Sequence, residues 1–565
     1  MFFLENIWKK NLFLFSIQSI HLFTSYSLFQ YFSRIVWQNM NSNILRKYLS
    51  SYNTKGFYER KLFDQIYGKP LINCDKNQNL FNDRICDDLC EVILNYLPIE
   101  EKFRLESVSK QFQRCIFNKQ TVIELKGCDQ KKNNRKNLYN CLVLTANSRY
   151  INIKAFESLL KKCRYCNDFR FKSYLIANRE EVLESVIKYC RYLKSISFDF
   201  NEISGETVLR FGLKFGENLQ KLCFVFSNPV ISVDNYILLF RLCPNLLTLN
   251  KVKLKHVIAA NELLVPKIRS IDMFYGKTDT KYVTDFVEKH KNSLKSLKIN
   301  TEVNGDILNH ILQEIQNFKN LEKLEIWSTA RVLTIDSEFI RNINRIGIEC
   351  KRLKYFKLMT NKVNQTNVSK LFQSLNTYHS VKYLDLRLLF RLKLDSNQSV
   401  ALKWLSACSQ IESIHLNYCG LNDRLFEDIG LHFHRLKRLS LTVDQITDKA
   451  MKSLSKLKSL KYLSLDVHHS RSVGFPLVTD SGLCHVIYHC PNIESIIFFG
   501  RPNITIVTIN ALILLALSKP KVSFNHYFGF IERKFSTEYT PIELAFLTNL
   551  PKNMIISTEL STYFA

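Results

Sequence analysis

The sequence predicts an α/β solenoid in which parallel strands line one side and helices line the other. A phrase of the form apolar, two residues, apolar, one residue, apolar occurs twelve times between Leu193 and Phe498, and Leu460-Lys-Tyr-Leu463-Ser-Leu465 is a clear copy. The last two apolar residues of a copy are two positions apart, so they share one face of a strand. Helical phrases stand between the copies. A helix that returns the chain to the same edge makes successive strands parallel.

The copies recur at a period typical of repeat proteins. The first begins at Leu193 and the last at Ile493, which is 300 residues over 11 intervals, or a mean near 27. Arrays of such units grow in one dimension, so 565 residues can fold without one very large core. The first apolar residues of the copies are Leu193, Leu219, Leu246, Ile268, Leu294, Leu321, Leu353, Val381, Ile411, Leu436, Leu460 and Ile493.

Local signals place the helices and the ends of the array. Thr447-Asp448 and Thr479-Asp480 open apolar helical patterns, as capping residues do, and Asn422-Asp423 opens a looser one. Weaker strand phrases at residues 122–125 and 150–153 predict extra N-terminal units. We therefore expect the solenoid over residues 121–520 and a cap on its open end over residues 521–565.

Composition indicates a globular and strongly basic chain. Hydrophobic residues make up 46% of it, and 79 Lys and Arg against 51 Asp and Glu give a formal charge of +28. This surplus suggests anionic partners, but its sign does not choose between nucleic acid, lipid headgroups and acidic proteins. No dense basic run occurs, because the charge is spread through the copies. A solvated repeat surface is the alternative interpretation.

The sixteen cysteines are interpreted as structural. Cys163 and Cys166 form the only CxxC pair, with no second pair at zinc spacing, and His485 and His489 lie within a predicted helix. We expect no metal, no cofactor and no disulfide framework, and hence an intracellular protein, cytoplasmic or nuclear. Five cysteines lie three residues before a copy, where a small buried side chain suits a helix end: Cys190, Cys243, Cys350, Cys408 and Cys490.

The N-terminal extension, residues 1–79, leaves three alternatives open. Its first 38 residues are aromatic and nearly uncharged from Asn11 to Ser33, after Lys9 and Lys10. That pattern is compatible with a membrane anchor or signal, with a helix docked on the body, or with a true start at Met40. Polar residues interrupt the apolar stretch, and the remaining chain has no sustained apolar run of the length that a membrane span needs. We expect no membrane contact unless residues 1–38 form an anchor.

Residues 80–120 predict a small all-α module. Apolar residues at Ile85, Leu89, Ile93 and Leu97 follow the spacing of one helix face, which ends at Pro98. Pro98 and the two acidic residues that follow it favour the start of a second helix. So short a module needs something to pack on, whether the repeats, a partner or both.

This module resembles the F-box. The chain has Ile93-Leu94-Asn95-Tyr96-Leu97-Pro98, then Glu100-Glu101, then Val108-Ser109-Lys110-Gln111-Phe112. It departs from the family at Ile85-Cys-Asp-Asp-Leu89, where the family has Leu-Pro-x-Glu-Leu. The resemblance implies docking on a Skp-type adaptor, and through it on a cullin, by apolar helix faces. A helical cap on the solenoid is the alternative. The implied adaptor-binding residues are Ile85, Leu89, Ile93, Leu94, Tyr96, Leu97 and Pro98.

The repeats resemble the cysteine-containing class of leucine-rich repeats. Cys243-Pro-Asn-Leu246 and Cys490-Pro-Asn-Ile493 match the joint of that class, which commonly follows an F-box. The resemblance implies a horseshoe with a concave parallel sheet and convex helices.

The residues between the apolar positions of each copy are expected to form the concave surface. Their basic surplus and their tyrosines, a residue type enriched at binding hot spots, suggest capture of an acidic or phosphorylated protein segment. A generic solvated lysine face is the alternative. The candidate target-binding residues are Lys295, Lys298, Lys323, Lys354, Tyr355, Lys357, Lys382, Tyr383, Arg438, Lys461 and Tyr462.

Two functions follow from these features. The first is the substrate-recognition subunit of a Skp/cullin/F-box ubiquitin ligase, which holds a target for ubiquitylation and proteasomal degradation by proximity and without catalysis of its own. The second is a leucine-rich-repeat scaffold or adaptor without ligase activity. An enzyme finds no support, because the chain has no P-loop, no Gly-x-Ser-x-Gly and no metal constellation. Nucleic acid is suggested by charge alone and is not expected as a partner.

Overall fold

A computed structural model describes two compact units of the chain, which meet in sequence after Leu193. This boundary falls inside the range 121–520. The predicted extension 1–79 and residues 80–109 of the predicted module, including all of its adaptor-binding residues, lie outside the described residues. The described residues are 110–118, 120–127, 141–146, 150–172, 177–200, 202–225, 233–253, 257, 267–275, 283–301, 305–328, 335–360, 368–388, 402–417, 423–443, 446–467, 478–499, 505–520, 522–529, 551 and 553–557.

The described residues of the first unit include three parallel strands, and β1 pairs with both β2 and β3. The strand predicted at residues 122–125 is confirmed as β1. The strand predicted at residues 150–153 is wrong, because Asn152 caps a helix there by accepting a hydrogen bond from the Ala155 N–H at 3.1 Å. The elements are α7 (Lys110–Asn118), β1 (Val122–Gly127), β2 (Cys141–Ala146), α8 (Ile153–Lys162), β3 (Asp168–Lys172) and α9 (Arg179–Tyr189).

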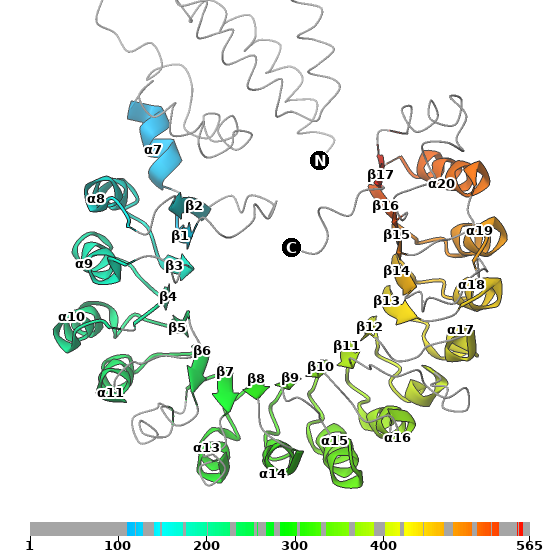
Figure 1. Ribbon diagram of the computed structural model, residues 1–565, viewed down its shortest axis with the longest axis horizontal. Coiled ribbons are helices and arrows are strands. Elements are labelled where there is room, and N and C mark those ends of the chain that lie inside the picture. Colours follow the sequence, from blue (N-terminus) through cyan, green and yellow to red (C-terminus); the bar gives the residue numbers. More distant parts are fainter. Residues whose placement is uncertain are drawn as a thin grey trace, which may run out of the picture. The chain divides into compact units, whose positions relative to one another are not determined.

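The second unit is a leucine-rich-repeat solenoid. Its described residues include fourteen strands, β4 to β17, and each pairs in parallel with the next. Figure 1 shows these strands along the inner side of an arc, with the helices outside them. The strands are β4 (Ser195–Phe198), β5 (Lys221–Phe224), β6 (Thr248–Lys253), β7 (Ser270–Tyr275), β8 (Ser296–Thr301), β9 (Lys323–Ser328), β10 (Tyr355–Thr360), β11 (Tyr383–Leu388), β12 (Ser413–Asn417), β13 (Arg438–Val443), β14 (Tyr462–Val467), β15 (Ser495–Phe499), β16 (Phe524–Gly529) and β17 (Met554–Ser557).

The convex side of this unit mixes α-helices with shorter 3₁₀ turns. The helices are α10 (Gly205–Phe215), α11 (Val233–Leu242), α13 (Val283–His290), α14 (Gly305–Ile315), α15 (Ser337–Glu349), α16 (Val368–Ser374), α17 (Ile429–His432), α18 (Asp448–Leu454), α19 (Asp480–His489) and α20 (Ile506–Ser518). The 3₁₀ turns are η3 (Leu375–Thr377), η4 (Leu402–Leu405) and η5 (Asp423–Phe426). A bilayer-spanning helix needs about 20 residues. Among the described residues, no helix combines that length with the necessary hydropathy.

All twelve predicted strands are confirmed as β4 to β15. Each begins two residues after the first apolar residue of its copy, as β8 begins at Ser296 after Leu294. Residues 521–565, expected as a cap, contribute two further strands, β16 and β17, so the sheet continues beyond residue 520. The sequences of β16 and β17 lack the repeated phrase, so the pattern did not predict them. They extend the sheet because β16 pairs with β15 and β17 pairs with β16.

The core lies between the sheet and the helices. In β8 the side chains alternate, with Leu297, Ile299 and Thr301 buried and the residues between them half-buried. On the other side α15 buries Phe339 and Ile346 at helical spacing. Burial of such side chains is the dominant favourable term in folding.

The repeat cysteines fill the joints as predicted. The Cys408 thiol donates to the Leu375 carbonyl oxygen at 3.2 Å, one repeat earlier, and Cys350 and Cys490 make longer contacts of the same kind. Burial raises the pKa of each of these three thiols to about 12. They are therefore inert apolar joints at neutral pH.

The Thr-Asp phrases cap helices and also join neighbouring repeats. Thr479 caps α19 and donates its hydroxyl to Asp448 of the preceding repeat at 2.6 Å, and its N–H to the same carboxylate at 2.9 Å. Thr447 binds Asp423 in the same way, and Thr505 binds Asp480. Each aspartate thus lies near the start of its own helix and orders the start of the next one.

Candidate functional site

The concave face is built from every second residue of the strands. Because the apolar second and fourth residues of a strand point into the core, the first, third and fifth point to the concave side. Successive strands pair in register from β7 to β12, so their third residues form a continuous row. A bulge in β6 shifts the register beside β7, where Lys251 has a φ of 58°. The shift follows the third residue of β6, so Asn250 still pairs with Asp272 and the row of third residues stays in register there.

Third residues of opposite charge alternate along this row. We call Asp272, Lys298, Glu325, Lys357 and Asp385, from β7 to β11, the central row. Lys298 Nζ lies 3.2 Å from Asp272 Oδ2, and Lys357 Nζ lies 3.0 Å from Asp385 Oδ2. The Lys357 side chain is only 9% exposed and that of Asp385 13%. The Lys357–Asp385 pair is therefore poorly screened by solvent.

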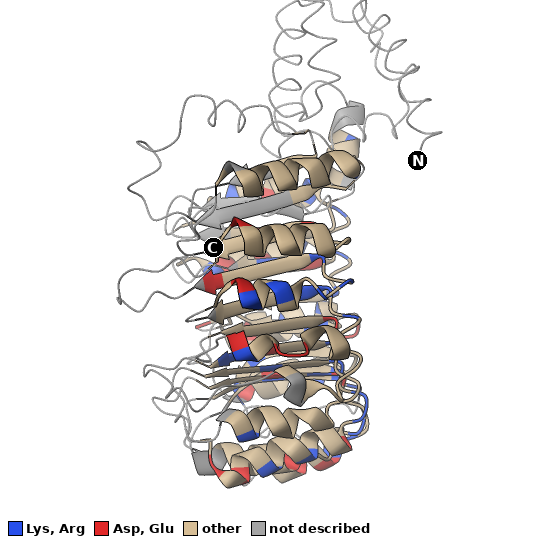
Figure 2. Ribbon diagram, turned by 90° about the vertical axis from the view of Figure 1, so that its right-hand side faces the viewer, with Lys and Arg blue, Asp and Glu red and all other residues tan. Residues whose placement is uncertain are grey.

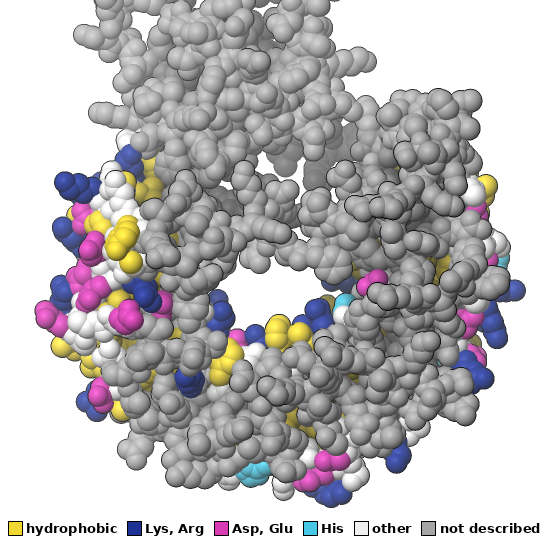
Figure 3. Space-filling model, viewed as in Figure 1, with side chains coloured by type: hydrophobic (Ala, Val, Ile, Leu, Met, Phe, Trp, Pro, Cys, Tyr) yellow, Lys and Arg dark blue, Asp and Glu magenta, His cyan; other side chains and the backbone are white. Residues whose placement is uncertain are grey.

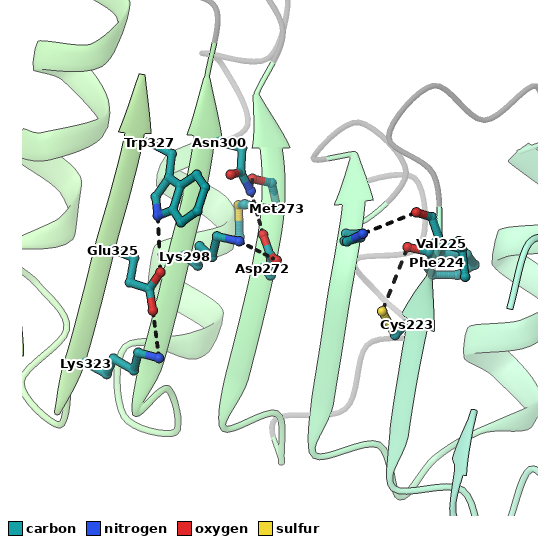
Figure 4. Close-up of polar contacts among 11 residues, drawn as sticks. Cys223, Phe224, Val225, Asp272, Met273, Lys298, Asn300, Lys323, Glu325 and Trp327 are labelled. Carbon is teal, nitrogen blue, oxygen red and sulfur yellow. Dashed lines mark hydrogen bonds and ion pairs between the residues drawn. The ribbon is translucent and has the colours of Figure 1, made fainter. Parts of the chain in front are cut away.

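Trp327 is held between the two lysines of the central row. Its ring centroid is 4.4 Å from Lys298 Nζ and 4.8 Å from Lys357 Nζ, within the range of cation–π attraction. The indole N–H donates to Glu325 Oε2 at 3.1 Å, and Lys323 approaches Glu325 Oε1 to 2.7 Å. Figure 4 shows Lys323, Glu325 and Trp327 stacked along β9, beside Lys298 and Asp272. These contacts fix the ring before any ligand is present.

Asp385 is the last residue of the central row and has two further basic neighbours, Arg387 and His415. Arg387 Nε donates to Asp385 Oδ1 at 3.0 Å, whereas His415 Nε2 is 4.0 Å away. Burial lowers the pKa of His415, although Asp385 opposes the shift. At neutral pH the imidazole is uncharged. Arg387 and Lys357 are then the two cations that compensate Asp385.

A second row lies at the start of the strands and is far more exposed. We call it the rim row, formed by the residue that precedes each strand. The Glu322 carboxylate pairs with Lys295 Nζ at 3.2 Å and with Lys354 Nζ at 3.0 Å. Hydrogen bonds from these two lysines hold the pKa of Glu322 below its usual value. Glu412 takes Lys382 and Lys437 in the same way, and Lys461 pairs with Glu494 at 2.6 Å. Exposed pairs of this kind contribute little to stability.

Aromatic residues lie between the two rows. Tyr355 and Tyr383 face each other across β10 and β11 with ring centroids 6.2 Å apart, and Lys323 lies 4.8 Å from the Tyr355 ring. Tyr383 is 39% exposed, so its ring is free to contact a partner. Arg438 is exposed, stands opposite Tyr462 in the next strand, and makes no ion pair with the residues that the structure describes. Figure 3 shows basic and hydrophobic side chains next to one another on the lower inner rim.

All eleven candidate target-binding residues lie on this face or its rim. The structure differs from an open lysine face in one respect. Eight of the eleven are lysines or the arginine, and seven of these, every one except Arg438, lie within 4 Å of a carboxylate of the same chain. In most of these pairs the carboxylate belongs to a neighbouring repeat. The pattern within one repeat therefore did not predict the pairing.

Three residues of this face, Trp327, Arg387 and His415, were not predicted from the sequence. Trp327 and Arg387 occupy the fifth position of their strands, one residue beyond the last apolar letter of the repeated phrase. Extending the two-residue alternation by one step would have placed both on the concave face. His415 occupies the third position of β12 and carried no charge that would have marked it.

The cysteines and histidines do not form a metal site within the described ranges, where no three ligating side chains are grouped. Cys163 and Cys166 are buried, and burial raises the pKa of Cys163 to about 12. The pKa of Cys166 is raised as well, first by its hydrogen bond with Cys190 and then by burial.

No protein-family model and no curated protein matches the chain. Among solved structures, it is similar to the crystal structure of the Rad7 and Elc1 complex in yeast, with 15% identity, a TM-score of 0.38, and coverage of 72% of this chain and 93% of that one. It is also similar to the leucine-rich-repeat-containing protein LegL7 from Legionella pneumophila, with 12% identity, a TM-score of 0.32, and coverage of 52% and 96%. Neither likeness is close enough to transfer a function.

Proposed function

We propose that the chain is the substrate-recognition subunit of a Skp/cullin/F-box ubiquitin ligase. The observation that carries the proposal is the succession of two parts in one chain. An F-box-like phrase occupies residues 85–112, and a leucine-rich-repeat solenoid follows it. In this arrangement one part holds the ligase and the other holds the target, so ubiquitin transfer is promoted by proximity.

The adaptor would bind the apolar face of the F-box-like phrase. Leu97 and Tyr96 lie in its best-matched stretch, which is outside the described residues. Helix-in-groove recognition depends on a few apolar anchors, and a charge placed at one of them must be desolvated on binding. The double variant Leu97→Asp, Tyr96→Ala should therefore abolish adaptor binding.

Affinity purification of the full chain tests this part. The parent should recover a Skp-type adaptor and a cullin, and the double variant should recover neither. Leu213→Asp with Tyr488→Ala is the matched control, because it makes the same two changes at side chains that are 68% and 62% exposed on the convex helices. Loss of the adaptor from the control as well would show that these two types of substitution reduce recovery wherever they are placed, and that the F-box-like phrase is not the binding site.

The target would bind the concave face. Tyr383, Arg438 and Tyr462 offer exposed or half-exposed contact area next to the ion-paired lysines. A phosphorylated or acidic segment could displace Glu322 or Glu412 and pair with the exposed rim lysines in its place, because exposed ion pairs of this kind are weak. The central row would instead act as a fixed floor.

Target capture is tested by quantitative proteomics of the purified complex after proteasome inhibition. Tyr383→Ala with Arg438→Glu should release the target while the adaptor and the cullin remain. Phosphatase treatment should release a phosphorylated target in the same way. A target that stays bound to the double variant would place its binding elsewhere on the chain.

A scaffold without ligase activity is the second candidate. The departure at Ile85-Cys-Asp-Asp-Leu89, which lacks the proline of the F-box family, favours it. If the parent recovers repeat-bound proteins but neither adaptor nor cullin, the scaffold is correct and the ligase proposal is wrong.

A further inference from the structure

The turns that lead into the strands of the second unit are strongly basic. We define the turn edge as nine turns, each ending just before one of the strands β7 to β15. They contain fourteen Lys and Arg and three Asp and Glu. The segments that lead from β7–β15 toward the next helix contain eight basic and five acidic residues. The turns are residues 267–269, 291–295, 316–322, 350–354, 378–382, 406–412, 433–437, 455–461 and 490–494.

Strand register places these cations at one level. The first residues of β7 to β15 pair directly with one another, so the turns before them line up without a step. Figure 2, which views the arc of Figure 1 from the side, shows the short turns along one level edge that carries Lys and Arg. Twelve of the fourteen side chains are exposed, all except Lys291 and Lys382. Nine strands at about 4.8 Å spacing make this edge about 40 Å long.

Contacts within the chain account for only part of this charge. The rim glutamates Glu322, Glu412 and Glu494 pair with five lysines of the edge. Cations also favour helix C-termini, where these turns begin. Yet Arg269, Lys351 and Lys456 make no ion pair or side-chain hydrogen bond with the described residues, and all three are exposed. Their charge is available to a partner.

We propose that the turn edge docks on an anionic lipid bilayer surface. A level edge, whose turns lie near one plane along the arc of the strands, matches a flat anionic sheet over its whole length, whereas a duplex presents a curved cylinder. The charges are eleven lysines and three arginines. Compact ammonium groups suit diffuse attraction to headgroups, while arginine forks dominate base and phosphate recognition in nucleic acids. Phe318, Tyr378 and Phe433 of these turns are buried, so they offer no platform for base stacking.

Sedimentation of the full chain with lipid vesicles tests the proposal. The probe is phosphatidylcholine vesicles with and without about 30% phosphatidylserine, at about 0.15 M salt. The parent should bind only the anionic vesicles. The edge variant Arg269→Glu, Lys351→Glu, Lys456→Glu should bind them on the order of 100-fold more weakly, because each basic residue near an anionic surface adds appreciably to binding.

A matched variant separates the edge from net charge. Arg341→Glu, Lys370→Glu, Lys452→Glu makes the same charge change at exposed residues of convex helices α15, α16 and α18. It should bind within about threefold of the parent, because charges beyond a Debye length are largely screened. Equal losses in both variants would overturn the proposal, as would a parent that ignores the vesicles but binds a duplex DNA or polyglutamate. None of these results depends on adaptor binding, which the Leu97 and Tyr96 variant reports separately.

Discussion

Lys354 and Lys357 lie three residues apart in one repeat and differ in almost every physical respect. The Lys354 side chain is 55% exposed and shares Glu322 with Lys295. The Lys357 side chain is 9% exposed and is enclosed by Asp385 and the Trp327 ring. One lysine belongs to the turn edge and the other to the central row. The same residue type is therefore a replaceable surface charge at one position and part of a fixed floor at the other.

Reversing one charge in each region should give the largest contrast. Lys357→Glu places a carboxylate beside Asp385 in a poorly solvated site and should lower the free energy of unfolding by about 3–5 kcal/mol. Lys354→Glu, at the exposed edge, should change it by less than about 1 kcal/mol. Urea unfolding of both variants measures the difference. Similar losses would show that the central row is not more rigid than the edge.

The aromatic centre of the row offers a second test. Trp327→Ala removes a half-buried ring, two cation–π contacts and a hydrogen bond to Glu325, and should cost about 2–3 kcal/mol. Trp327→Phe keeps a ring for both lysines and should cost about 1 kcal/mol. Thermal unfolding of the two variants checks this order. An alanine variant as stable as the phenylalanine variant would mean that the lysines do not hold the ring.

His290 extends the comparison to the interior behind the turn edge. It is fully buried at the end of α13, and both ring nitrogens lack a hydrogen-bond partner among the described residues. Burial, and then Lys289, lower its pKa to about 4. The unfolded chain takes up a proton below about pH 6.5 and the folded chain only near pH 4. Stability should therefore fall with pH across that window, by about 2 kcal/mol from pH 7.5 to pH 5.

His290→Leu should remove this pH dependence. The Leu294 N–H donates to the His290 carbonyl just as the Leu219 N–H donates to the carbonyl of the buried Phe215, so this joint accepts an apolar side chain elsewhere. The variant should also be about 1 kcal/mol more stable at neutral pH, because an unsatisfied polar group leaves the core. Urea unfolding at pH 7.5 and pH 5 compares it with the parent. An unchanged slope between the two pH values would assign the acid sensitivity to other groups.

The smallest change in the free energy of unfolding should come from the variant with the largest change in charge. Arg269→Glu, Lys351→Glu, Lys456→Glu alters six charge units at the turn edge but breaks no described ion pair. Its unfolding free energy should stay within about 1 kcal/mol of that of the parent. Differential scanning fluorimetry is sufficient to measure this. A loss comparable to that of Lys357→Glu would show that the edge cations are structural.

Repeat periodicity made most of the fold predictable, whereas contacts between repeats were not. The starts of β4 to β15, the joint cysteines and the Thr-Asp caps are signalled within one repeat. Lys295 and Glu322 are 27 residues apart, and their pairing appears only when neighbouring strands are placed in register. The basic edge escaped notice for the same reason, since no two of its turns are adjacent in sequence. The region around Asn152 was predicted wrongly for another reason. Its alternating apolar pattern predicted a strand, whereas these residues form the start of a helix.

The contact between Thr479 and Asp448 has a consequence for how the chain can change in length. A repeat that opens with Thr-Asp offers a hydroxyl to the repeat before it and a carboxylate to the repeat after it. Both halves of the joint are the same in each such repeat, so a duplicated copy would fit between its neighbours without any change in either. The C-terminal side of the solenoid can thus be extended or shortened by whole repeats. Each addition would widen the concave face by one strand and leave the existing contacts intact.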